Sequence, residues 1–193
     1  MKKILVSYFA PFGILPTNSS FEVAKRIDMA NVDKIELEVK YQKDFKTLMN
    51  ATFNKDYDYI LMLGQARGRD HISLESRATN LNNPKAADND NFYPNEEIIE
   101  GGSHYLYTKV DIEGIISKIN KEIVSISKNA GSYLCNYIYY LCLNEIKIPS
   151  LFIHLPSFAG QGDEERIPTL KLDEMVDVIK QIIMVLSEDT DND

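Results

Sequence analysis

Basic residues, cysteine and long apolar runs are all scarce in this chain, and each shortage excludes a class of protein. The 193 residues contain 21 lysines and arginines against 29 aspartates and glutamates, a net charge of −8. A surface of that sign repels phosphate backbones, so nucleic acid is not an expected partner. No apolar run approaches the ~18–20 residues that a membrane span needs, and the opening MKKILVSYFAPFG lacks the cleavage site of a secretory signal. We therefore expect a cytoplasmic protein with no membrane partner.

Cysteine is limited to Cys135 and Cys142. Both lie in one apolar segment long enough for a helix, where two turns would separate their Cα atoms by roughly 10 Å. A disulfide tolerates about 7 Å at most. The three histidines are scattered at positions 71, 104 and 154, so no zinc-type Cys/His spacing is present. The sequence predicts a reducing compartment and thiols that either pack or take part in chemistry.

Strand and helix patterns alternate along the chain. Short apolar or alternating runs indicate strands, and runs with one apolar face indicate helices. Strands are expected at 2–9, 34–41, 59–64, 71–76, 123–127 and 149–156, and helices at 19–30, 43–54, 111–122, 132–146 and 171–186. Such alternation predicts a three-layer α/β sandwich, with a mainly parallel or mixed twisted sheet flanked by helices. Residues 1–186 are expected to form a single domain, and the acidic residues 187–193 a disordered tail.

Two helix starts and one loop are indicated by local signals. Ser19 followed by Glu22 has the spacing of a capping box. Ser132 is expected to cap the helix that carries the cysteines. Seven of the twelve residues in 80–91 are Asn or Asp, which predicts a loop.

Ligands of open α/β sheets bind beyond the carboxyl ends of the strands. That rule selects residues 9–18 after the first strand, 64–69 after the third and His154 at the end of the last. Helix N-termini gather at the same edge, which brings Cys135 there too. A thiol, an imidazole and several carboxylates are therefore expected to meet at one place.

Cys135 is open to two interpretations. In the first turn of its helix, partial positive charge would lower the pKa of the thiol and free amides could hold an oxyanion. Free cysteine, however, is among the most buried residue types and mostly packs, as we expect of Cys142. His154 could likewise be structural, but a cysteine nucleophile needs a base, and a strand end places His154 at the expected edge. Glu75 is a candidate to orient the imidazole.

Four stretches stand out together: FAPFG with Asn18 after it, LGQARGRDHISLESRATN, NAGSYLCNYIYY and FIHLPS. Their order and spacing resemble those of the pyroglutamyl-peptidase (pyrrolidone-carboxylate peptidase) family of cysteine exopeptidases, over essentially the whole chain. The resemblance implies a Cys–His–Glu triad, with Cys135 as nucleophile, His154 as general base and Glu75 orienting the imidazole.

The resemblance also implies six substrate-binding positions: an aromatic pair against the pyrrolidone ring, two polar side chains near the ring, and an acid and a base in the loop after the glutamate. They are Phe9 and Phe12, Asn18 and Gln65, and Asp88 and Lys85. The implied substrate is a peptide with an N-terminal pyroglutamate, a flat lactam whose faces suit aromatic side chains. The implied reaction needs no metal and no cofactor.

Three residues depart from the family pattern. Ile14 and Arg67 stand where the family usually has glycine, and Lys85 where it tends to have arginine. Glycine can serve positive φ or close backbone approach, and lysine lacks the planar fork of arginine, so these changes could reshape the site. Two alternatives to a pyroglutamyl peptidase therefore stay open: a cysteine amidohydrolase of the same fold with a different small substrate, and an inactive relative that only binds a ligand.

Two further interpretations, nucleotide binding and oligomerisation, depend on patterns outside the triad. The glycine loop at 64–68 matches neither the P-loop nor the dinucleotide fingerprint, which excludes a nucleotide-binding module. The family is commonly tetrameric, which implies a homo-oligomer, either a dimer or a tetramer. Residues 132–146 hold more apolar side chains than one buried face requires. That surplus fits a subunit interface and burial within one chain equally well.

Overall fold

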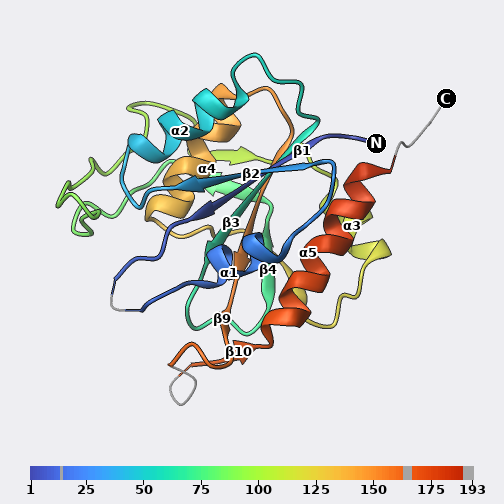
Figure 1. Cartoon of the computed structure of the whole chain (residues 1–193). Coiled ribbons are helices and arrows are strands. Elements are labelled where there is room, and N and C mark those ends of the chain that lie inside the picture. The colour runs from blue at the N-terminus through green and yellow to red at the C-terminus, as the bar shows by residue number, and fades with distance from the viewer. Residues whose placement is uncertain (14, 163–166, 189–193) are drawn as a thin grey trace.

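The computed structural model describes residues 1–13, 15–162 and 167–188, and it is built around a six-stranded sheet in the order β2-β1-β3-β8-β4-β7 (Figure 1). Its elements are β1 (Ile4–Phe9), α1 (Ser19–Arg26), β2 (Val32–Leu37), α2 (Lys43–Thr52), β3 (Tyr59–Gln65), β4 (Ile72–Glu75), β5 (Arg77–Thr79), β6 (Tyr105–Tyr107), α3 (Ile112–Lys118), β7 (Val124–Ser127), α4 (Leu134–Glu145), β8 (Ser150–Leu155), β9 (Ser157–Phe158), β10 (Thr169–Leu170) and α5 (Leu172–Ser187). The expected order of strands and helices is confirmed. The short strands β5, β6, β9 and β10 were not predicted.

The sheet is mixed, as one form of the prediction allowed. Strands β2, β1, β3 and β8 run parallel, whereas β4 is antiparallel to β8 and parallel to β7. The register pairs His154 of β8 with Gly64 of β3 on one side and with Ser73 of β4 on the other. Because directly paired residues present their side chains to the same face, these three positions face one side of the sheet.

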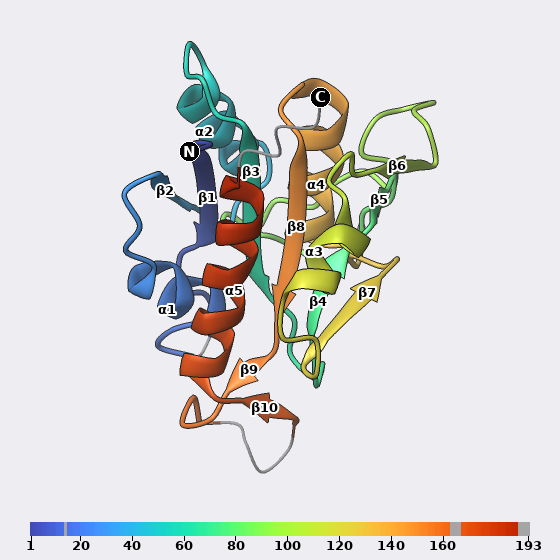
Figure 2. The ribbon, with the colours of Figure 1, turned by 90° about the vertical axis from the view of Figure 1, so that its right-hand side faces the viewer.

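Helices cover both faces of the sheet, which gives three layers (Figures 1 and 2). On one face, α1, α3 and α5 pack against side chains such as Val6 and Leu61; on the other, α2 and α4 pack against Leu5 and Met62. Neighbouring residues of the central strands point to opposite faces, and both faces are buried. This explains why the central strands appear in the sequence as continuous apolar runs.

The apolar surplus of α4 is largely buried within the chain itself. Ile138, Tyr139, Tyr140 and Cys142 are all 0% exposed. The buried tyrosine hydroxyls find partners: that of Tyr139 donates to the carbonyl of Glu75 at 2.8 Å and that of Tyr140 to the carbonyl of Ser103 at 2.6 Å. Of the two explanations for this surplus, burial within one chain accounts for these four side chains.

Several element ends differ from the sequence prediction for identifiable reasons. The strand expected to reach residue 41 ends at Leu37, which pairs with Phe9, the last residue of its partner strand β1. The N–H of Tyr41 donates instead to the carboxylate of Asp88 at 2.9 Å. The first helix ends at Arg26, well before residue 30. Residues 80–91 contain neither helix nor strand, as expected. Most of the expected tail, residues 189–193, lies outside the described residues.

Both predicted helix caps are off by one residue. The N-cap of α1 is Asn18, whose side chain accepts from the N–H of Phe21, and Glu22 instead accepts from the Thr17 hydroxyl at 2.7 Å. The N-cap of α4 is Tyr133, not Ser132, and it makes no side-chain cap hydrogen bond. Within the described part of the chain, no helix combines the length and apolarity that crossing a bilayer would require.

Candidate active site

Cys135 is the second residue of α4, so it lies in the first helical turn even though the cap has moved to Tyr133. Its side chain lies directly against the backbone of β3 at Gly64. A Cβ added to Gly64 would stand 2.9 Å from the Cys135 Sγ and 2.8 Å from the ring of Phe152. Side chains essentially never approach so closely, so glycine at position 64 is what allows the thiol to reach the sheet.

We expect Gly64→Ala to lower kcat for the peptidase reaction that the family resemblance implies, on the order of 10²-fold. The new methyl must displace either the thiol of Cys135 or the ring of Phe152. The matched control is Gly102→Ala, whose Cβ would crowd the hydroxyl of Tyr140 at the same 2.9 Å without touching the thiol. Steady-state kinetics and thermal unfolding on both variants separate the two effects. Equal activities in the two variants would show that the contact with the thiol is unimportant.

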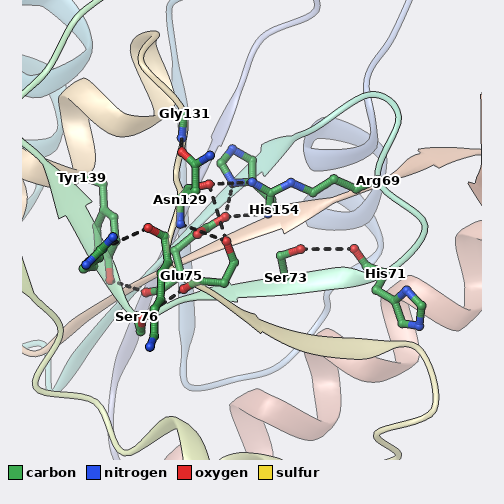
Figure 3. Close-up of polar contacts among 12 residues, drawn as sticks. Arg69, His71, Ser73, Glu75, Ser76, Asn129, Gly131, Tyr139 and His154 are labelled. Atoms are coloured by element: carbon green, nitrogen blue, oxygen red, sulfur yellow. Dashed lines mark hydrogen bonds and ion pairs between the residues drawn. The ribbon is translucent and has the colours of Figure 1, made fainter.

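His154 and Glu75 form a buried pair at the centre of the sheet (Figure 3). Nδ1 of His154 lies 2.7 Å from Oε1 of Glu75, and the two side chains are 5% and 0% exposed. A carboxylate can only accept, so Nδ1 carries the proton and Nε2 is left as the acceptor. Because Gly64 pairs with His154 in the register, the Cys135 thiol above Gly64 lies beside the strand that carries the imidazole. The three predicted triad residues are therefore brought together.

The ionisation of these groups differs from the prediction at one point. The pKa of Cys135 is raised to about 12, mainly by burial and also by the charges of Glu75 and Asp44, whereas Arg69 opposes the rise. The expected lowering of the thiol pKa by the helix terminus is thus wrong for the free enzyme, because desolvation outweighs it. Burial also lowers the pKa of His154, against the effect of Glu75. Burial opposes ionisation of Glu75, yet the hydrogen bonds from His154 and Ser127 and the charges of His154 and Arg69 together outweigh it and keep the pKa of Glu75 below its usual value.

Near neutral pH, the site therefore holds an ionised Glu75, a neutral His154 and a neutral Cys135 thiol. We expect iodoacetamide to alkylate Cys135 at a rate that climbs about tenfold per pH unit between about pH 7 and 10, because only the thiolate reacts. Peptide mapping of the wild type reports Cys135, and a Cys135→Ala protein isolates the reaction of Cys142. A plateau of the Cys135 rate below about pH 8 would mean a lowered pKa, as the sequence had suggested.

A small apolar pocket adjoins the thiol. Its walls come from the loop after β1, the end of β3 and the start of α4, and they comprise Phe9, Phe12, Val39, Gln65, Tyr133, Leu134 and Cys135. Phe9 is buried, whereas Phe12 is 42% exposed. The predicted aromatic pair thus meets the predicted nucleophile in one pocket.

A larger cavity of about 450 Å³ lies next to this pocket and shares Phe12 and Gln65 with it. Its lining residues are Phe12, Gly13, Leu15, Thr17, Asn18, Gln65, Arg67 and Gln161. A water-sized void is on the order of 10–15 Å³ by the same kind of measure, so this cavity has room for several non-hydrogen atoms of a ligand.

The side-chain amides of Asn18 and Gln65 are already engaged by the protein. Nδ2 of Asn18 donates to the carbonyls of Phe9 and Ala10, each at 3.1 Å. Oε1 of Gln65 accepts from the N–H of Ser19 at 2.7 Å, and its Nε2 donates to Ser157 at 3.1 Å. Both residues therefore hold the pocket walls in place.

Asp88 and Lys85 do not line the pocket or the larger cavity. The carboxylate of Asp88 accepts backbone N–H groups of Tyr41, Asp90 and Phe92 at 2.8–3.0 Å, which folds its own loop onto the segment after β2. That loop supports the pocket wall from behind, because the carbonyl of Ala87 accepts from the Tyr133 hydroxyl at 2.8 Å. Lys85 is exposed.

Of the two glycine replacements, Arg67 lies at a described position and Ile14 does not. Arg67 is not among the residues with positive φ, whereas the next residue, Gly68, has φ +86°. The backbone at position 67 therefore does not require glycine, and the arginine side chain lines the larger cavity.

Three functional candidates were missed from the sequence. Arg69 contacts Glu75 at 2.7 Å, and Gln161 donates to Gln65 at 3.0 Å. Asp44 is 0% exposed, has no partner for Oδ2, and its burial raises its pKa well above the usual value. Arg69 stood within the loop selected by the strand-end rule, but nothing in its spacing indicated its partner. Among the described residues, no cluster of three or more His, Cys, Asp or Glu side chains could hold a metal ion.

Comparisons with known proteins show the family of the chain. The sequence profile of the pyroglutamyl peptidase family matches residues 2–189. A pyrrolidone-carboxylate peptidase of Bacillus amyloliquefaciens is 32% identical over 192 residues, covering 93% of this chain and 89% of the relative. A pyrrolidone-carboxylate peptidase 2 of Caldanaerobacter subterraneus is 33% identical, with 95% and 96% covered.

Solved structures are similar over nearly the whole chain. A crystal structure of the Bacillus amyloliquefaciens pyroglutamyl peptidase I superposes with a TM-score of 0.90 at 30% identity, covering 97% of this chain and 98% of the other. A mutant pyrrolidone carboxyl peptidase of Pyrococcus furiosus gives 0.86 at 27% identity, with 97% and 99% covered. The chain described above, with its thiol held against the sheet beside a buried His–Glu pair, belongs to the pyroglutamyl peptidase family.

Proposed function

We propose that this protein is a cysteine exopeptidase that removes an N-terminal pyroglutamyl residue from peptides, with Cys135 as nucleophile, His154 as general base and Glu75 as the residue that orients His154. The observation that carries the proposal is the placement of the Cys135 thiol against Gly64, next to the buried His154–Glu75 pair. Membership of the family supports the same activity.

The first step follows from the resting ionisation. Nε2 of His154 takes the proton of the thiol as sulfur attacks the carbonyl that joins the pyroglutamyl residue to the next residue. Glu75 stabilises the imidazolium that forms and fixes the tautomer. The first N–H groups of α4 have no partner within the helix, so they are suited to hold the developing oxyanion.

The second step releases the products. The His154 imidazolium gives its proton to the leaving amine as the carbon–nitrogen bond breaks, which leaves a thioester on Cys135. Water then attacks the thioester, with His154 again taking a proton and returning it to sulfur. Pyroglutamate and free thiol result, and the proton count is restored.

The pocket walls suit the acyl group of this reaction. Phe9 and Phe12 offer aromatic surface to the lactam ring beside the thiol. The polar network that involves Asn18 and Gln65 holds these walls at a fixed separation. The larger cavity shares Phe12 and Gln65 with this pocket, so we assign it to the peptide that follows the pyroglutamyl residue. We assign Asp88 a role in shaping its loop, and Lys85 no direct contact with the ring.

The test is the release of a fluorogenic amine from a pyroglutamyl amide under reducing conditions. The matched substrates are a prolyl amide, which lacks the lactam carbonyl, and a glutaminyl amide, which lacks the ring. We expect hydrolysis of the pyroglutamyl amide alone. A folded protein that cleaves none of the three would contradict the proposal, and equal cleavage of the prolyl amide would point to a different acyl group.

Assembly and location remain predictions. We propose a homo-oligomer, a dimer or tetramer, on the strength of the family resemblance, and analytical ultracentrifugation measures its mass directly. The cytoplasmic location is supported by two unbridged cysteines, which fit a reducing compartment.

A further inference from the structure

We propose that Arg69 is a positioning residue for this reaction, because its guanidinium holds the carboxylate that orients the base and the loop that leads into the nucleophile helix. This inference rests on the proposed function.

Arg69 contacts two different parts of the site with its two terminal nitrogens (Figure 3). Nη1 lies 2.7 Å from Oε1 of Glu75, the same oxygen that pairs with Nδ1 of His154. Nη2 donates to the carbonyl of Asn129 at 2.7 Å. A planar guanidinium fixes the directions of both bonds at once, which an ammonium group cannot do.

The Asn129 contact connects Arg69 to the nucleophile. The side chain of Asn129 accepts the N–H of Gly131 at 3.0 Å, and Gly131 takes the left-handed conformation at φ +84°. The turn so formed leads directly into α4, whose second residue is Cys135. Arg69 therefore ties the start of α4 to Glu75, and through Glu75 to His154.

The charge of Arg69 also acts on the base. Among the described residues, the charged groups that act on His154 are Glu75 from β4 and Arg69 from the loop after β3, and the Cys135 thiol from α4 lies against Gly64, the residue paired with His154. The positive charge of Arg69 lowers the pKa of His154, whereas Glu75 raises it. Removing the arginine must therefore raise the pKa of His154, so that imidazolium, which cannot accept the thiol proton, persists to higher pH.

The informative variants are Arg69→Met, which removes charge and donors, and Arg69→Lys, which keeps the charge and loses the fork. We expect kcat/KM at neutral pH to fall about 10- to 100-fold in Arg69→Met, with the acidic limb of its pH profile moved to higher pH. In Arg69→Lys the acidic limb should stay in place while kcat remains reduced. Should Arg69→Met fail to fold, Arg69→Gln removes the charge and keeps amide donors.

Arg77→Met is the matched control. Nε of Arg77 donates to the carbonyl of Lys128 at 3.0 Å, beside the carbonyl that Arg69 holds, but the pair of Glu75 and His154 is not among its contacts. We expect this variant to keep the wild-type pH profile. The same loss of kcat/KM and the same shift of the acidic limb in Arg77→Met would overturn the proposal. Holding the loop before α4 would then be enough to explain both effects, with no contact to Glu75.

NMR titration of the His154 imidazole in resting enzyme gives a readout that does not depend on turnover. A raised pKa of His154 in Arg69→Met, with the wild-type value in Arg77→Met, is the expected result. An unchanged pKa of His154 and an unchanged pH profile in Arg69→Met would refute the proposal. If the wild type cleaves no pyroglutamyl amide, the proposed function fails instead, and the titration still decides whether Arg69 controls His154.

Discussion

Replacing Cys135 with alanine is expected to abolish hydrolysis of pyroglutamyl amides, with a loss in kcat on the order of 10⁶-fold. The thioester cannot form without the sulfur, and no other nucleophile takes its place: the pocket beside Gly64 is otherwise lined by carbon-rich side chains and Gln65. Steady-state rates of the wild type and the variant, measured at equal protein concentrations after mass spectrometry has verified both proteins, give the ratio of their kcat values directly. Residual activity within tenfold of wild type would remove Cys135 from the mechanism.

The control for this variant is the second cysteine. Cys142 is 0% exposed in the middle of α4, and its thiol donates to the Ser150 hydroxyl at 3.2 Å. Cys142→Ala leaves a small cavity and removes one contact of the Ser150 hydroxyl, which still donates to the carbonyl of Ile148 at 2.8 Å, so we expect it to lose about 1–2 kcal/mol of stability. Its kcat should stay close to wild type. We therefore expect Cys135→Ala to be detected by its loss of activity and Cys142→Ala by its loss of stability.

The second large effect is expected for Glu75→Gln, with kcat/KM lowered on the order of 10²–10⁴-fold. Arg69 and Nδ1 of His154 both contact Oε1 of Glu75, and Arg69 can only donate, so a glutamine keeps its carbonyl oxygen at that position and loses the negative charge that stabilises the imidazolium. Without that charge His154 is a weaker base toward the thiol, and the Cys135 pKa of about 12 leaves almost no thiolate to compensate. The substitution also removes the charge that pairs with Arg69 at 2.7 Å.

The matched control for Glu75→Gln is Asp70→Asn. Oδ1 of Asp70 lies 2.8 Å from Nδ1 of His71, the same kind of acid–histidine contact, but both side chains are exposed. We expect this variant to keep wild-type kcat/KM, because exposed pairs contribute little and this one lies outside both cavities. A Glu75→Gln enzyme as active as Asp70→Asn would show that His154 does not need the charge of Glu75 to act as the base.

The placement of two of the three proposed triad residues could be predicted because their signals are local. His154 follows an apolar run that indicates a buried strand, and Cys135 follows a turn that indicates a helix start, so a shift of one residue in the cap changes little. Glu75 was one candidate to orient His154, and the family resemblance implied that role. The strand-end rule alone would have misplaced it, because β4 runs antiparallel to β8 and brings Glu75 opposite Phe152, two residues before His154.

The features of the site that could not be predicted from the sequence depend on long-range packing. The raised pKa of Cys135 comes from its burial against Gly64, a contact across 71 positions in the chain. Arg69 and Asn129 meet across 60 positions. The backbone N–H groups that Asp88 accepts, which fold its own loop, could not be predicted from the sequence either. In each case, the residue type was visible and its partner was not.

The division of the site between sheet and loop has an evolutionary consequence. His154, Glu75 and the contact point of Cys135 lie on paired strands in the middle of the sheet, whereas the wall of the larger cavity, which we assigned to the peptide after the pyroglutamyl residue, is built largely from the loop between β1 and α1. Insertions or exchanges in that loop can therefore alter which peptides enter while proton transfer stays intact. A lineage carrying this fold can diversify its substrates through one surface segment and keep its chemistry constant.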